Sequence, residues 1–209
     1  MARRNRGISG RGRAEGRGPR GLGPTWLGWL TAVALLAGAL GGAPPAGAAT
    51  AREIETSVDV ALERFYREVQ GAREFARIAK GMLVLPRVVK GAFIVGGEYG
   101  EGALRIGGKT VAYYNVIAGS FGFQFGAQSK DIIIAFMTDE ALKRFRESPG
   151  WEAGVDGNIA LLDVGAGERL DTTTARHPIV GFVFGVKGLM ADVSVKGAKF
   201  TRLDKPLAE

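Results

Sequence analysis

The 209-residue sequence contains no cysteine and a single histidine, His177. The absence of cysteine excludes disulfide bonds, thiol catalysis and the acylated cysteine of a lipoprotein signal. One histidine supplies neither a metal-ligand spacing nor a catalytic triad, and His177 precedes a proline in a segment typical of a loop. We therefore expect no enzymatic activity, no metal and no cofactor.

An excess of positive charge is also missing from most of the chain. The net charge is +7, but residues 1–48 hold seven arginines and one glutamate, which leaves 21 basic and 20 acidic residues in 49–209. Affinity for nucleic acid depends largely on cations that neutralise phosphates. A nearly neutral domain therefore argues against a nucleic-acid partner.

Residues 1–48 have the three parts of a secretory signal peptide: an arginine-rich segment, an apolar run over 26–40, and small residues ending at Ala46-Gly-Ala48. The run is shorter than the ~20 residues that span a bilayer. We predict cleavage after Ala48 and export to the periplasm or outside the cell, peripheral to a membrane; a single N-terminal transmembrane anchor is the alternative. The Arg3-Arg4 pair hints at twin-arginine export, but the apolar residues expected after such a pair are missing.

The remaining residues, 49–209, are predicted to form one domain, helical over 51–80 and mainly β over 82–203. Apolar residues recur every three or four positions in 51–80, with a break expected at Gly71. A short second helix is expected after Gly71, through Phe75 and Ile78. One more helix, capped by Thr138 or Asp139, is expected to end before Pro149. Tight turns are expected at 107–108, 156–158 and 196–197. The predicted strands are 82–85 (ending at Pro86), 88–97, 100–106, 110–118, 131–137, 158–164, 179–184, 189–195 and 198–203.

Strands that follow one another without helical crossovers indicate an antiparallel sheet. The predicted fold class is α+β: N-terminal amphipathic helices packed on a strongly curved, glycine-rich antiparallel sheet, either a sandwich or a partial barrel. In 119–126, a period of two places Phe121, Phe123 and Phe125 on one face and leaves the other face nearly bare. A bare face allows a helix or second sheet to pack closely; a ligand groove is the alternative.

Other motifs do not predict chemistry. The glycines of 97–102 do not open a helix after a strand, so a dinucleotide site is not predicted. Asp156-Gly-Asn158 lacks the twelve-residue calcium pattern, and nothing selects Glu98 and Glu101 as an acid–base pair.

Several separate blocks of the chain occur in a characteristic order: 80–86, 90–105, 113–115, 119–130, 150–157, 170–174 and 180–190. Over residues 55–203 they resemble the SYLF-domain family. The resemblance implies a lipid-binding module without catalysis. In the family that the chain resembles, eukaryotic members associate with phosphoinositide membranes and some fungal members bind actin. Bacterial members are typically exported envelope proteins.

An exported protein meets neither an actin cytoskeleton nor phosphoinositides, so neither is expected as a partner here. An anionic lipid or membrane surface is the expected partner, and a structural or protein-interaction module that holds another envelope protein is the alternative.

In the eukaryotic relatives an N-terminal amphipathic helix contributes to membrane contact, and the matching segment here is 51–80. The alternative is that this helix only packs its apolar stripe on the sheet and exposes a mixed-charge face. The candidate lipid-binding residues are Arg64, Arg67, Arg73, Arg77, Lys80, Arg87 and Lys90.

Overall fold

The computed structural model describes residues 48–91, 97–119, 128–164, 173–187 and 195–208. Contacts divide the chain into two units, Met1–Gly47 and Ala48–Glu209, and the description concerns the second. The predicted leader, the phenylalanine stripe of 121–125 and most of the predicted strand 189–195 lie outside the described residues. Within these ranges, no helix is long and apolar enough to cross a membrane.

Two helices open the domain, with a break where it was predicted. Helix α2 (Ala51–Glu68) begins at a capping box in which the Thr50 side chain accepts from the Glu53 N–H and the Glu53 carboxylate accepts from the Thr50 N–H. Gly71 has a φ of 81° and precedes α3 (Ala72–Ile78). A left-handed conformation is accessible to glycine at little cost, which explains the break.

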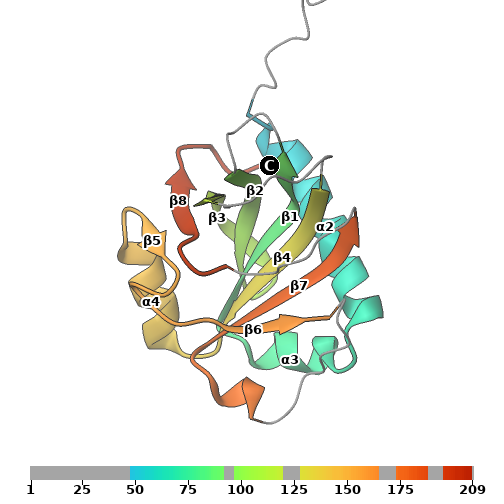
Figure 1. Ribbon diagram of the computed structural model, residues 1–209, viewed down its shortest axis with the longest axis vertical. Coiled ribbons are helices and arrows are strands. Elements are labelled where there is room, and N and C mark those ends of the chain that lie inside the picture. The colour runs from blue at the N-terminus through green and yellow to red at the C-terminus, as the bar shows by residue number, and fades with distance from the viewer. Residues whose placement is uncertain (1–47, 92–96, 120–127, 165–172, 188–194, 209) are drawn as a thin grey trace, which may run out of the picture. The chain divides into compact units, whose positions relative to one another are not determined.

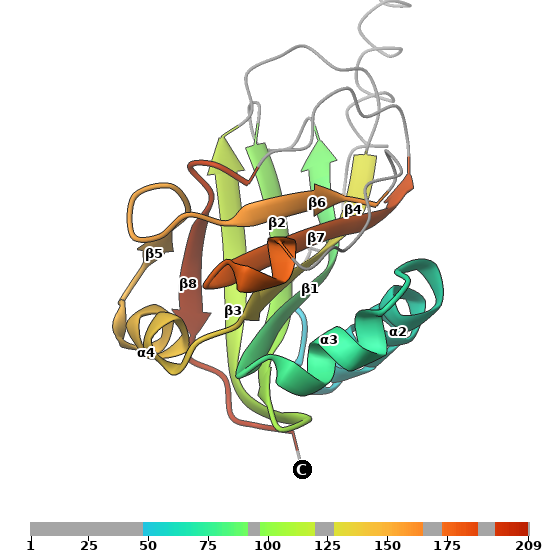
Figure 2. The ribbon, with the colours of Figure 1, turned by 90° about the horizontal axis from the view of Figure 1, so that it is seen from below.

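One sheet contains all the named strands of the described residues, in the order β5-β8-β3-β2-β1-β4-β7-β6. Neighbouring strands are antiparallel except β6 and β7, which are parallel. Figures 1 and 2 show α2 and α3 together on one side of this sheet and α4 (Asp139–Glu147) on the other. The strands are β1 (Gly81–Gly91), β2 (Gly97–Ile106), β3 (Lys109–Gly119), β4 (Gln128–Phe136), β5 (Trp151–Glu152), β6 (Ala160–Asp163), β7 (Ile179–Lys187) and β8 (Lys199–Leu203).

The sheet curls into a partial barrel, one of the two predicted forms. A side-chain carbon added to Gly157 would lie 2.8 Å from Trp151 of β5 and 3.2 Å from Ile179 of β7, so strands from opposite parts of the sheet approach each other there. Both residues belong to one apolar cluster with Leu83 and Leu104 of the central strands. We call this the inner cluster, because only the inside of a curl brings such strands together.

A second apolar cluster, the outer cluster, joins the helices to the other face of the sheet. Phe65 of α2 and Phe75 of α3 both contact the ring of Phe182 in β7, at centroid distances of 4.9 and 5.2 Å. Val84 and Tyr113, on β1 and β3, are completely buried in the same cluster. The predicted packing of an amphipathic helical segment on a curved sheet is therefore confirmed.

Strand β1 corrects the prediction that a strand ends at Pro86. The strand continues to Gly91 through a bulge between Leu85 and Val88. Within the bulge, Arg87 has a φ of 51° and its backbone N–H donates to the Asp131 carboxylate at 2.9 Å. Proline lacks an N–H but is tolerated at a bulge, where the ladder is already interrupted.

The predicted cap at Thr138 and the predicted turn at 107–108 are confirmed, whereas the turn predicted at 156–158 lies at 154–156. Helix α4 begins after Thr138, whose hydroxyl accepts from the Ala141 N–H at 3.2 Å, and ends at Glu147 before Pro149. Gly107 and Gly108 form the turn between β2 and β3 with φ values of 58° and 78°. Such values suit the tight hairpin turns that favour glycine.

Candidate functional site

The candidate basic residues separate into two groups. Arg67, Arg73, Arg77 and Lys80 lie on or directly after α2 and α3, and all are exposed. Within the described part of the chain, none of the three arginines forms an ion pair, whereas Lys80 lies 3.2 Å from the exposed carboxylate of Asp139. A pair between exposed side chains is worth little, so this group remains available to an external anion.

Helix α3 also exposes an apolar side chain next to Arg77. Ile78 is 58% exposed and follows Arg77 directly. One turn earlier, the Arg73 guanidinium lies over the Tyr66 ring, 4.8 Å from its centroid. Stacking of this kind orients a guanidinium while leaving its N–H donors free.

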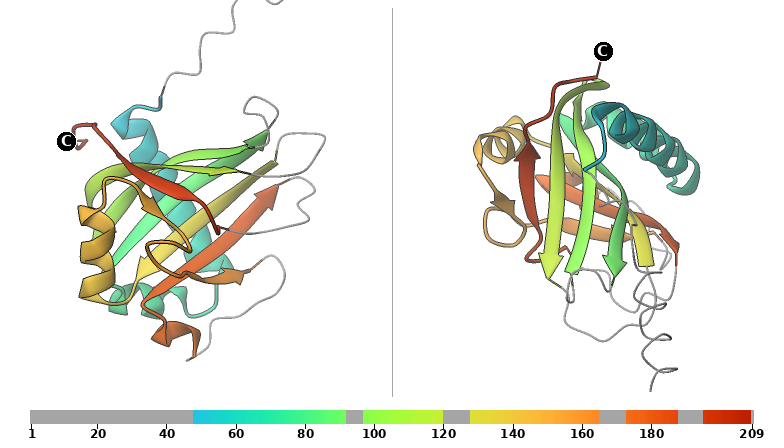
Figure 3. Two further views of the ribbon diagram at one scale, coloured as in Figure 1. Left: turned by 60° about the vertical axis from the view of Figure 1, so that its left-hand side comes forward. Right: turned by 90° about the horizontal axis from the view of Figure 1, so that it is seen from above.

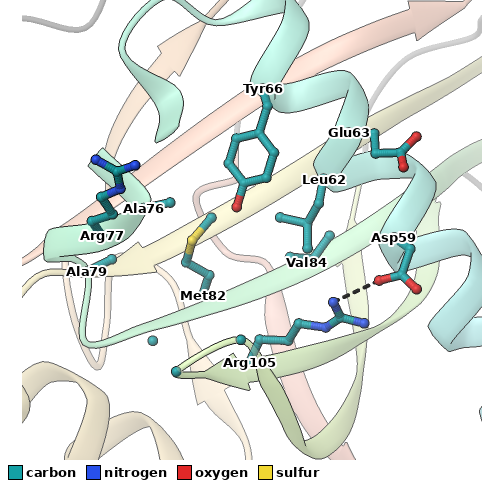
Figure 4. Close-up of a pocket in the computed structure, with 13 residues that line it drawn as sticks. Asp59, Leu62, Glu63, Tyr66, Ala76, Arg77, Ala79, Met82, Val84 and Arg105 are labelled. Carbon is teal, nitrogen blue, oxygen red and sulfur yellow. Dashed lines mark ion pairs between the residues drawn. The ribbon is translucent and has the colours of Figure 1, made fainter. Parts of the chain in front are cut away.

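A pocket of about 610 Å³ lies between the two helices, the first residues of β1 and the turn between β2 and β3. Figure 4 shows Leu62, Tyr66 and Met82 within it and Arg77 at its edge; Arg105 pairs with Asp59 at 2.8 Å along another edge. The volume falls in the range of about 300–1,000 Å³ common for small-ligand sites. The lining residues are Asp59, Leu62, Glu63, Tyr66, Ala76, Arg77, Ala79, Gly81, Met82, Val84, Arg105, Gly107 and Gly108.

The second group of candidates, Arg64 on α2 and Arg87 and Lys90 on β1, lies apart from the first. Arg64 forms an ion pair with the buried carboxylate of Asp131, which also accepts from the Arg87 N–H. Arg87 is exposed, but Lys90 is half-buried and is paired in register with Glu98 on β2. The structure therefore does not bring all seven candidates onto one surface, and Arg64 has a structural partner.

An anchoring network that sequence spacing did not indicate holds α2 on the sheet. The Glu55 carboxylate accepts hydrogen bonds from Arg105 at 2.7 Å, Tyr113 at 2.8 Å and Thr110 at 3.0 Å. Burial alone would raise the pKa of Glu55, but the three hydrogen bonds and the Arg105 charge together lower it below the ordinary value of 4.5. Charged Glu55 therefore stabilises the folded state.

The Glu55→Gln variant is expected to lose stability near neutral pH and to converge on the parent at low pH. Because the folded-state pKa is lowered, the contribution of Glu55 is present above its ordinary pKa of 4.5 and disappears as pH falls through the folded-state value. Urea unfolding of both proteins between pH 7 and about pH 3 measures the difference. A difference that is independent of pH would contradict this role.

A buried ion pair lies on the opposite face of the sheet. Lys130 Nζ is 2.9 Å from the Glu98 carboxylate, and the two side chains are only 1% and 9% exposed. Glu101, three residues after Glu98, points to the helix side of β2 and meets Lys205 at 3.5 Å. The two glutamates thus lie on opposite faces and form no acid–base pair.

The described residues contain no group of three or more histidine, aspartate or glutamate side chains placed to hold a metal ion. No curated protein matches the chain. A family described as "Ysc84: Las17-binding protein actin regulator" matches residues 117–205, from the end of β3 through β8. This family, which contains the SYLF domain, is one of lipid- and actin-binding domains rather than enzymes. Residues 117–205 match this family model, in agreement with the predicted resemblance to the SYLF-domain family.

Proposed function

We propose that the chain is exported by its N-terminal leader and acts in the cell envelope as a non-enzymatic module that binds an anionic membrane surface. The family supports a binding domain, and the leader's sequence supports export. The nearly balanced charge of the rest of the chain argues against nucleic acid as the partner.

The observation that carries the proposal is the surface of α3. Exposed Ile78 directly follows exposed Arg77. Neither Arg77 nor Arg73 has an ion-pair partner in the described residues, although α3 also exposes Glu74. At an interface, an apolar side chain enters the boundary between headgroups and acyl chains while neighbouring cations attract anionic phosphates. Arginine suits this role, because its guanidinium can donate two parallel hydrogen bonds to one phosphate.

Replacing Arg73 and Arg77 together with glutamine is expected to weaken binding to anionic vesicles about thirtyfold, because each cation contributes about 1 kcal/mol near such a surface. Co-sedimentation at two salt concentrations measures the effect, and binding by the parent is expected to weaken with salt. The assay uses the unit Ala48–Glu209, which contains both apolar clusters, because the seven leader arginines would bind anionic vesicles themselves.

The matched control replaces Lys143 and Arg146 with glutamine. Both residues are exposed on α4, on the other side of the sheet, so this variant removes the same charge from a different surface. Equal weakening by the two variants would show that only net charge matters. A parent protein that binds neutral and anionic vesicles equally at low salt would overturn the proposed function.

A protein partner in the envelope is the second candidate. The family description names a protein that its members bind, which favours protein recognition within the family. Crosslinking in intact cells followed by purification of the chain tests this candidate. One reproducible envelope partner, together with no affinity for anionic vesicles, would replace the lipid proposal.

A further inference from the structure

A row of side chains crosses the outer face of the sheet beyond the area that α2 covers. In register, Lys187 pairs with Ser129, Ser129 with Val89, Val89 with Tyr99, Tyr99 with Ile117, and Ile117 with Lys199. Directly paired residues of antiparallel strands point to the same face. We call these six residues the outer row: Lys187, Ser129, Val89, Tyr99, Ile117 and Lys199.

Along β1 and β3, residues of the outer row are exposed, whereas their chain neighbours on the inner face are buried. Val89 is 40% exposed and Ile117 is 50% exposed, whereas their chain neighbours Val88 and Val116 are each 1% exposed on the inner face. The outer cluster includes Tyr113 of β3 but not Ile117, four residues further along the same strand. Figure 3 shows the ends of the central strands extending past α2. The outer row is therefore an apolar part of the sheet that the helices leave open.

Positive charge surrounds this apolar centre. Lys187 and Lys199, at the two ends of the row, are exposed, as is Arg87 in the bulge of β1. Glu152 is paired in register with Lys199 at one end, so that end is partly balanced, whereas Lys187 and Arg87 form no ion pair within the described residues.

The centre of the row adds no negative charge. Burial and a 2.6 Å hydrogen bond from its hydroxyl to Glu101 raise the pKa of Tyr99 to about 12, so this side chain stays neutral. Glu101 itself is 7% exposed and is balanced by Lys205. The next row along the strands pairs Gly91 with Gly97 and Gly97 with Gly119, so no side chain rises beside Val89 and Ile117 there.

We propose that the outer row is a membrane-inserting surface of the domain, in which Val89 and Ile117 enter the interface of an anionic bilayer and Lys187 and Arg87 contact lipid phosphates. An apolar centre with a neutral tyrosine and a cationic border matches a bilayer interface, where aromatic residues and lysines are enriched. This inference rests on the proposed function and adds a lipid contact on the sheet, separate from the basic surface of α3.

The absence of cysteine allows a direct test, because a single introduced cysteine carries an environment-sensitive fluorophore at one site only. The label on Ile117→Cys is expected to shift to the blue and brighten several-fold with anionic vesicles, and to be quenched by nitroxide-bearing lipids. The label on Lys143→Cys, on the exposed surface of α4, is expected to change little. Vesicle-bound protein whose Ile117 label is unchanged would overturn the inference.

A second variant removes the apolar contact without a label. Replacing Val89 and Ile117 with serine is expected to weaken vesicle binding about tenfold, because the apolar area transferred to the interface is lost. Both sites are exposed, so the fold is expected to persist. The control is Val155→Ser, which removes a 74% exposed side chain from the turn after β5.

The outcomes separate the two proposals. If the unit Ala48–Glu209 does not bind anionic vesicles at all, the proposed function fails and the inference fails with it. If that unit binds and the Val89/Ile117 variant binds equally well, the outer row is not a lipid contact and the proposed function stands.

Discussion

Replacing Gly102 with alanine is expected to destabilise the domain by about 3 kcal/mol or more, the upper range for overpacking a well-packed core. A methyl group at this position would overlap the carbonyl oxygen of Val84 and lie 2.8 Å from the Cα of Leu85. These atoms are backbone at the start of the β1 bulge, so a rotamer change cannot relieve the overlap. Urea unfolding followed by the fluorescence of Trp151, which is 2% exposed and the only tryptophan after the leader, measures the loss.

Gly119→Ala is the matched control for this prediction. Gly119 also lies in a central strand, but a methyl group there would meet no atom within 4 Å. Its free energy of unfolding is expected to stay within about 0.5 kcal/mol of the parent. Similar losses for both variants would mean that the cost comes from placing alanine in a central strand, and that overlap with the β1 bulge does not determine it.

The second large effect is expected from Lys130→Met. This substitution leaves the Glu98 carboxylate buried without its cation, and breaking one partner of a buried pair typically costs about 3–5 kcal/mol. The Glu98 side chain is 9% exposed and accepts from Lys130 at 2.9 and 3.1 Å, so little water can replace the ammonium group. Thermal or urea unfolding at neutral pH is expected to show the loss.

The double variant Lys130→Met with Glu98→Leu distinguishes charge pairing from simple packing. Replacement of both charges by apolar side chains is often close to neutral, so the double variant is expected to be more stable than Lys130→Met alone. The single variant Glu98→Leu completes the comparison. If the stability losses of the two single variants add up to the loss of the double variant, the ion pair does not determine the cost of either substitution.

Local signals accounted for much of the fold. The break at Gly71, the cap at Thr138 and the turn at 107–108 each depend on residues adjacent in sequence, and all appear where predicted. The path of β1 through Pro86 depends instead on Asp131, which lies 44 residues beyond Arg87 and accepts its N–H. The parallel pairing of β6 with β7 likewise has no local signal.

The candidate site shows the same division. Periodicity correctly identified a helical segment with exposed cations, but it could not show that Arg64 is paired with Asp131, 67 residues away. Alternation along β1 could not place Lys90 either, because a bulge changes which residues share a face. The outer row brings together side chains from six strands, and only the pairing register reveals it.

The two edges of the sheet are formed by short strands. Among the described residues, the outermost strands, β5 and β6, contain only two and four residues. Long open edges are templates for strand addition between molecules, and very short ones are not. Under the proposed function, molecules would gather on a membrane at a high local concentration, and we expect these short edges to let the domain crowd there without stacking into fibres.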